Sequence, residues 1–180
     1  TEFRRVLFRS HANYDDVCTG RTGFREAVQV AYEDGAVSLP HLLFAFFAAI
    51  DPETPNRQGP DVGSQYQTGV YWTDPADEGV IRSIAALEAA AVPFFAVELK
   101  PLACFYPAED FHQRYLEKHP RGYCHVAPLE AGGPAGLSIF HNHLHLSRKR
   151  AAAGLERGRR SVFLTGGGAL FSTGCPCLCK

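Results

Sequence analysis

A short polar run, Asn56 to Tyr71 with the sequence NRQGPDVGSQYQTGVY, restricts the fold of this chain more than any other feature. Its first part, around Gly59 to Gly63, has the glycine, proline and aspartate composition of a tight loop. Its last part leads into an apparent strand, and the run carries one carboxylate, Asp61, together with two phenols. Ionisable and hydrogen-bonding side chains on one loop beside a strand are typical of a catalytic site.

The residues around this run predict alternating strands and helices. A period of two predicts a strand over 27–32. Ser38 is a plausible N-cap, Pro40 suits the first turn, and Leu42 to Ile50 is apolar on nearly every side, which predicts a buried helix. The further predicted elements are a strand at 67–72, a helix at 75–90, a strand at 94–99 and a helix at 109–118. This order indicates an α+β sandwich with helices covering a small mixed sheet.

The length and composition favour one domain outside the membrane. A chain of 180 residues with 46% hydrophobic content can bury one sizeable core. The longest apolar run has nine residues, whereas about 20 are needed to span a bilayer. Cys18, Cys104 and Cys124 are scattered singly, which is typical of reduced thiols, and we expect a cytoplasmic protein.

The first ten residues are expected to be a non-native leader. The segment EFRRVLFRS back-translates to a stock sequencing-adapter oligonucleotide, and the chain contains no methionine. An ordinary basic arm is the alternative interpretation. Residues 1–10 are therefore left out of the fold prediction.

Residues 128–180 form an unassigned basic segment that we expect to be disordered or frameshifted. It holds seven lysines and arginines against two acidic residues, without the interleaved aromatic residues that favour nucleic-acid binding. Histidines and cysteines near its end offer an alternative, a metal-binding module. Their one-residue gaps argue against zinc, whose ligands usually pair at wider spacing. These residues are His141, His143, His145, Cys175, Cys177 and Cys179.

Four blocks in order carry a family resemblance. The run at 56–71, with VCTGRTGFREAVQVAY (17–32), CFYPAEDFHQRYLEKHP (104–120) and GYCH (122–125), closely resembles peptide methionine sulfoxide reductases of the A type. The resemblance implies a ferredoxin-like α/β sandwich over residues 11–127. That family has a Gly-Cys-Phe-Trp segment near its N-terminus that holds the nucleophile, and no such segment occurs here. We therefore expect a sheet without its first strand and helix, with exposed edges and marginal stability.

The resemblance also implies roles for individual residues. Glu26 would be the acid, Tyr14 and Tyr66 would donate hydrogen bonds to the sulfoxide oxygen, and Asp61 would organise the site. Cys124 would be the recycling cysteine, whose disulfide thioredoxin opens. Without the surrounding motif, each of these residues could instead be ordinary surface, loop or core.

The predicted reaction is thiol-dependent reduction of free or peptide-bound methionine (S)-S-oxide in oxidised proteins. No metal or organic cofactor, nucleic acid or membrane partner is implied. Two alternatives stay open: a catalytically inactive fragment, and Cys18 as a substitute nucleophile.

Overall fold

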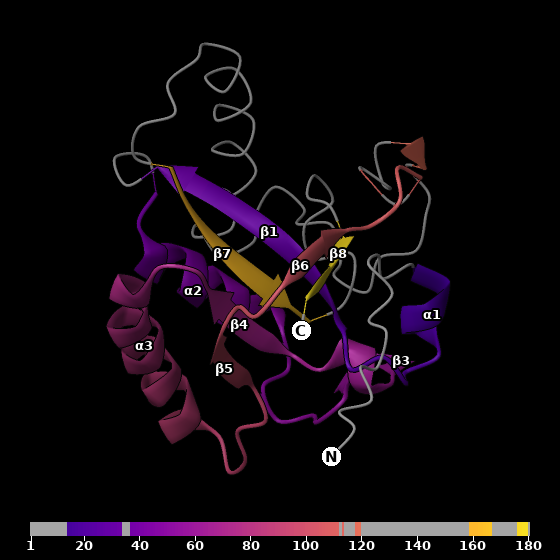
Figure 1. The fold of residues 1–180 in the computed structure, drawn as a ribbon. Helices are drawn as coiled ribbons and strands as arrows, with labels where there is room; N and C mark the ends of the chain where they lie inside the picture. Colours follow the sequence, from indigo (N-terminus) through magenta and orange to yellow (C-terminus); the bar gives the residue numbers. More distant parts are fainter. Residues whose placement is uncertain are drawn as a thin grey trace, which may run out of the picture.

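A computed structural model describes residues 14–33, 37–111, 113, 118–119, 159–166 and 176–179 (Figure 1). Its main feature is a six-stranded mixed sheet in the order β5-β4-β7-β1-β8-β6. Strands β4 and β5 are parallel, and the other neighbours are antiparallel. The strands are β1 (Arg25–Glu33), β4 (Gly69–Trp72), β5 (Glu98–Pro101), β6 (Phe105–Pro107), β7 (Arg159–Thr165) and β8 (Pro176–Cys179).

Helices and a small hairpin complete the described part. The hairpin pairs β2 (Arg57–Gln58) with β3 (Asp61–Val62). The helices are α1 (Tyr14–Cys18), α2 (Leu39–Ala49) and α3 (Glu78–Ala91), with two 3-10 turns, η1 (Ser64–Tyr66) and η2 (Pro75–Asp77). None of these helices combines the length and the apolar character that crossing a bilayer needs.

Helices α2 and α3 pack together and contribute to the core on one face of the sheet (Figure 1). Alternate residues of the three central strands point into this core, as the two-residue period of a strand requires. They are Val28 and Val30 of β1, Val70 and Trp72 of β4, and Val162 and Leu164 of β7. Helix α2 contributes Leu39, Leu42, Leu43, Phe46 and Phe47.

The opposite face of the sheet carries a smaller cluster and a charged network. Phe163 of β7 packs edge-on against Phe105, with ring centroids 4.6 Å apart. Beside them the Tyr71 hydroxyl donates to Glu98 Oε2 at 2.6 Å, and Arg25 and Lys100 each lie 3.1 Å from Glu98 Oε1. Burial alone would raise the pKa of Glu98, but the hydrogen bonds from these three partners outweigh burial and lower it.

The predicted elements up to residue 101 are present with shifted boundaries. The strand predicted at 94–99 is found at 98–101, and the predicted helix at 75–90 begins with a 3-10 turn. The helix expected at 109–118 lies mostly outside the described residues.

Helix α2 departs from the prediction in one detail: it is not buried on all sides, because Phe44 is 45% exposed. Only one side of the helix meets the sheet and α3, so a side chain on the other side stays in solvent however apolar it is. Ser38 is the N-cap residue, as predicted, but its hydroxyl lies 2.6 Å from His41 Nδ1 and makes no capping hydrogen bond to the backbone.

Strand β7 is the main departure from the sequence analysis. It comes from the segment expected to be disordered, yet it pairs with β1 on one side and β4 on the other. Residues 162–166 are buried. Residues 159–165 and 176–179 of this segment are therefore strands of the sheet, while most of the rest of 128–180 lies outside the described residues. Strand β7 fills the centre of the sheet, where the sequence analysis expected a missing strand to leave exposed edges.

Candidate active site

Glu26 lies buried near the start of β1, with only 7% of its surface exposed. Burial and the nearby charge of Asp61 raise its pKa from the ordinary 4.5 to about 7, although a hydrogen bond from Tyr66 lowers it. Its Oε1 atom has no hydrogen-bond partner among the described residues. Near neutral pH this carboxyl is therefore partly protonated and can donate a proton.

Tyr66 ends the 3-10 turn η1 and reaches Glu26 from the loop side. Its backbone N–H donates to Gly63 O at 3.0 Å. Gly63 has φ 151°, and a Cβ there would collide with the Gln65 side chain, so this turn requires glycine. Burial, followed by the charges of Glu26, Asp61 and Cys18, raises the pKa of Tyr66 to about 12, although a hydrogen bond from Gln65 lowers it. The phenol consequently keeps its proton and serves as a hydrogen-bond donor.

Asp61 is half-buried on β3, directly after the hairpin turn. The hairpin pairs Gln58 with Asp61, and Gly59 between them has φ 58°. The sequence predicted this aspartate as the organiser of the site. The structure places its charge near both Glu26 and Tyr66, where it favours the protonated form of each.

Cys18 ends helix α1 on the exposed side of the same site. Two side chains of η1 hold the loop after this helix: Gln65 Nε2 donates to Cys18 O at 3.4 Å, and Ser64 Oγ donates to Gly20 O at 2.9 Å. Cys18 is therefore close enough to Tyr66 to influence the pKa of the phenol. Neither Cys18 nor Cys104 forms a disulfide.

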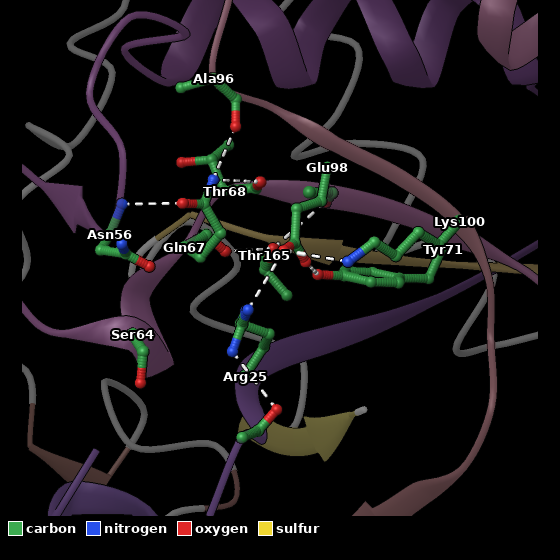
Figure 2. A network of polar contacts seen from close by, with 12 residues as sticks. Arg25, Asn56, Ser64, Gln67, Thr68, Tyr71, Ala96, Glu98, Lys100 and Thr165 are labelled. Atoms are coloured by element: carbon green, nitrogen blue, oxygen red, sulfur yellow. Dashed lines mark hydrogen bonds and ion pairs between the residues drawn. The ribbon is translucent and has the colours of Figure 1, made fainter. Parts of the chain in front are cut away.

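A buried polar network fixes the loop that carries Asp61 and Tyr66 (Figure 2). Gln67, 5% exposed, accepts from Asn56 N at 2.7 Å and donates to Ala96 O at 2.7 Å. Gln58, 4% exposed, donates to Thr68 Oγ1 at 3.0 Å. These glutamines replace the backbone pairing that an irregular loop lacks, so the loop keeps one conformation.

The structure thus brings together three of the five predicted site residues: Glu26, Asp61 and Tyr66. Tyr14 begins helix α1, and the role of its phenol stays a prediction. Cys124 lies outside the described residues.

Sequence patterns did not point to the residues that support the site. Gln58, Gln67 and Thr68 lie in the polar run 56–71, but an amide side chain in a polar loop gives no signal of burial. Within the described ranges no three histidine, cysteine or acidic residues form a group that could hold a metal ion.

The chain is similar to known proteins over the part that carries this site. The family model described as peptide methionine sulfoxide reductase matches residues 8–132. A peptide methionine sulfoxide reductase MsrA from Clostridium perfringens is 46% identical over 114 residues, covering 63% of this chain and 73% of the relative. The protein of the same name from Mycoplasma pneumoniae gives the same identity and coverage.

Two solved structures resemble the fold. Mxr1 from Saccharomyces cerevisiae in reduced form is 38% identical with a TM-score of 0.59, over 62% of each chain. Methionine sulfoxide reductase A of Corynebacterium diphtheriae is 36% identical with a TM-score of 0.57, over 68% of this chain and 65% of its own. This chain therefore spans less than two thirds of either solved chain. The likeness confirms the predicted α+β fold with a mixed sheet.

Proposed function

This chain belongs to the peptide methionine sulfoxide reductase family, and we propose that Glu26, Tyr66 and Asp61 form the part of its site that receives the sulfoxide oxygen. The family reduces methionine sulfoxide, and the reaction needs a proton and hydrogen-bond donors at the departing oxygen. The observation that carries the proposal is the buried Glu26 carboxyl, with a pKa of about 7, in a hydrogen bond with the Tyr66 phenol.

The proposed chemistry consists of two steps, reduction of the sulfoxide by one thiol and formation of a disulfide with a second thiol. A cysteine thiolate, which none of the described residues supplies, attacks the sulfur of methionine (S)-S-oxide. The S–O bond breaks, the oxygen passes to the attacking sulfur, and Glu26 supplies the proton that the oxygen takes up. The products are methionine and a sulfenic acid. A second thiol then attacks the sulfenic acid, so that a disulfide forms and water leaves.

Tyr66 and Asp61 have supporting roles in this scheme. Tyr66 donates a hydrogen bond to the oxygen, because its raised pKa keeps the phenol protonated throughout the physiological range. Asp61 keeps Glu26 protonated, because its charge opposes a second charge nearby. Tyr14, at the start of α1, is proposed as the second phenol.

The thiols are the other part of the proposal. Cys124 is proposed as the recycling cysteine and thioredoxin as the external reductant, in the cytoplasm, where thiols such as Cys104 stay reduced. Among the described residues Cys18 is the thiol whose charge acts on the site. Helix α1 carries two acidic residues, Asp15 and Asp16, and no basic residue in its last turn, where Cys18 lies. The helix therefore supplies none of the positive charge that activates a thiol, and we assign Cys18 no catalytic role.

The test is dithiothreitol-driven reduction of a methionine S-sulfoxide by the purified chain, with Glu26→Gln and Cys18→Ser alongside it. Where wild type turns over, we expect Glu26→Gln to lose about 10²- to 10⁴-fold, and the wild-type rate to fall above pH 7 as Glu26 loses its proton. Turnover that disappears in Cys18→Ser would contradict our account of that thiol.

Binding of dimethyl sulfoxide, followed by NMR of the same samples, separates the remaining outcomes. Folded protein that binds the sulfoxide through Glu26 and Tyr66 without turnover would have the oxygen side of the site and no nucleophile. The proposed function would be contradicted if the protein is folded and the NMR signals of Glu26 and Tyr66 do not change when dimethyl sulfoxide is added.

A further inference from the structure

Strand β7 runs between the two halves of the proposed site. Its last residue, Thr165, is opposite Ala27 of β1 on one side and Gly69 of β4 on the other. Ala27 directly follows Glu26, and Gly69 comes three residues after Tyr66. The end of β7 is therefore the place in the sheet where the strand of the acid and the segment of the phenol are joined.

The side chain of Thr165 makes this junction specific. Thr165 is 1% exposed, and its hydroxyl donates to Gln67 O at 2.8 Å (Figure 2), with Gly69 O at 3.3 Å. Gln67 directly follows Tyr66, and its own amide bridges Asn56 and Ala96. The hydroxyl thus ties the centre of the polar network to the strand that lies beside Glu26.

We propose that Thr165 is a positioning residue of the sulfoxide site, whose hydroxyl holds the Gln67 backbone and thereby sets the Tyr66 phenol against the Glu26 carboxyl. Thr165 does not contact the reacting atoms and acts through Tyr66. The proposal rests on the proposed function. It gives a role in the site to a strand that lies beyond residues 8–132, the range matched by the family model.

The rival explanation is that Thr165 is an ordinary buried threonine with a satisfied hydroxyl. That explanation predicts a loss of stability from its removal and no change in how Glu26 titrates. The positioning role predicts a change at Glu26, because a hydrogen bond from Tyr66 lowers the pKa of this carboxyl. Glu26 belongs to β1 and not to the loop, so its burial should survive when the loop shifts.

The test compares Thr165→Val, which removes the hydroxyl at nearly constant volume, with Thr165→Ser, which keeps it. Ser161→Ala is the matched control on the same strand, since the Ser161 hydroxyl accepts a hydrogen bond from the exposed Gln29 amide, at 3.2 Å. Carbon-detected NMR of labelled glutamate follows the titration of Glu26, and dimethyl sulfoxide serves as the probe ligand. Thr165→Ala takes the place of the valine variant if that variant does not fold.

We expect the titration midpoint of Glu26 to rise in Thr165→Val and in Tyr66→Phe. The Glu26 midpoint of the double variant should be no higher than that of Tyr66→Phe, because both changes remove the same hydrogen bond. Dimethyl sulfoxide should bind about five- to tenfold more weakly to Thr165→Val. Thr165→Ser and Ser161→Ala should behave as wild type.

Two results would overturn the proposal: an unchanged Glu26 midpoint in a folded variant without the hydroxyl, or shifts in Thr165→Val and Tyr66→Phe that add. If the wild-type protein does not bind dimethyl sulfoxide, the proposed function is wrong. The titration of Glu26 still decides whether Thr165 positions Tyr66.

Discussion

Two buried regions of this molecule are stabilised in different ways. Beneath α2 and α3 the sheet buries an apolar core, with Leu43, Phe46 and Trp72 at most 2% exposed. Beneath the loop that carries Tyr66 the protein buries amides and hydroxyls, among them Gln67 and Thr68.

The free energy that the apolar core contributes depends on the surface area it buries, whereas the contribution of the polar network depends on the geometry of its hydrogen bonds. Apolar burial contributes about 25 cal/mol per Å² in any orientation that excludes water. A buried amide contributes little net free energy when paired, and costs about 1–3 kcal/mol when a partner is lost. The core should therefore determine whether the chain folds, and the network should determine whether Glu26 and Tyr66 meet. Four substitutions test this division, and they are ordered from the largest expected effect to the smallest.

The largest expected effect comes from a cavity in the core. Leu43→Ala should lower the free energy of unfolding by about 2–5 kcal/mol, because Leu43 is fully buried between α2 and the sheet. Urea unfolding measures this change, and the Glu26 titration of the folded protein should stay as in wild type. Leu87→Ala, at a position 62% exposed on α3, is the control and should change stability by less than about 0.5 kcal/mol. A shifted Glu26 titration in Leu43→Ala would show that the two regions are not separable.

The second effect is the pH dependence that Glu26 imposes. Its pKa is 4.5 ordinarily and about 7 in the folded protein, so the folded state binds more protons between these values. Stability should consequently fall as pH rises through this window, by about 3 kcal/mol in all. Glu26→Gln should remove this slope and be the more stable protein at pH 8, as measured by urea unfolding at pH 5 and pH 8. Equal slopes in the two proteins would mean that Glu26 is not buried as described.

The third test breaks the polar network itself. Gln67→Leu keeps the side chain large but leaves Asn56 N and Ala96 O without their amide partner, at a cost of about 1–3 kcal/mol. Unlike Leu43→Ala, it should also change the Glu26 titration, because Gln67 adjoins Tyr66. Gln29→Leu, on the exposed part of β1, controls for the loss of an amide. A Gln67→Leu protein with an unchanged Glu26 titration would refute the assigned role of the network.

The smallest effect is expected on the opposite face of the sheet. Tyr71→Phe removes the hydrogen bond to Glu98 Oε2 and should cost about 1 kcal/mol at neutral pH. The lowered pKa of Glu98 contributes stability above its ordinary range, and that contribution is lost as the solution becomes acidic. The difference between Tyr71→Phe and wild type should therefore shrink in acid, in thermal melts at pH 3 and pH 7. A difference that is constant with pH would show that the hydroxyl does not act through Glu98.

Sequence patterns pointed to candidate site residues but not to the residues that hold them in place. Glu26, Asp61 and Tyr66 are ionisable or phenolic residues inside recognisable blocks, and the structure brings them together. Gln67 and Thr165 were missed, because a hydrogen bond between residues 98 positions apart has no trace in local composition. The Val-Phe-Leu-Thr run of β7 did carry a strand signal, and the unusual composition of the surrounding segment concealed it.

The sequence by itself determined the family, the α+β class and the positions of most elements from Arg25 to Pro101, because hydrophobic periodicity and turn residues act over a few positions. Only the tertiary structure decided that β7 fills the centre of the sheet and that burial beside Asp61 raises the pKa of Glu26. Strand order and desolvation depend on which distant segments meet, and that is a property of the packed chain as a whole.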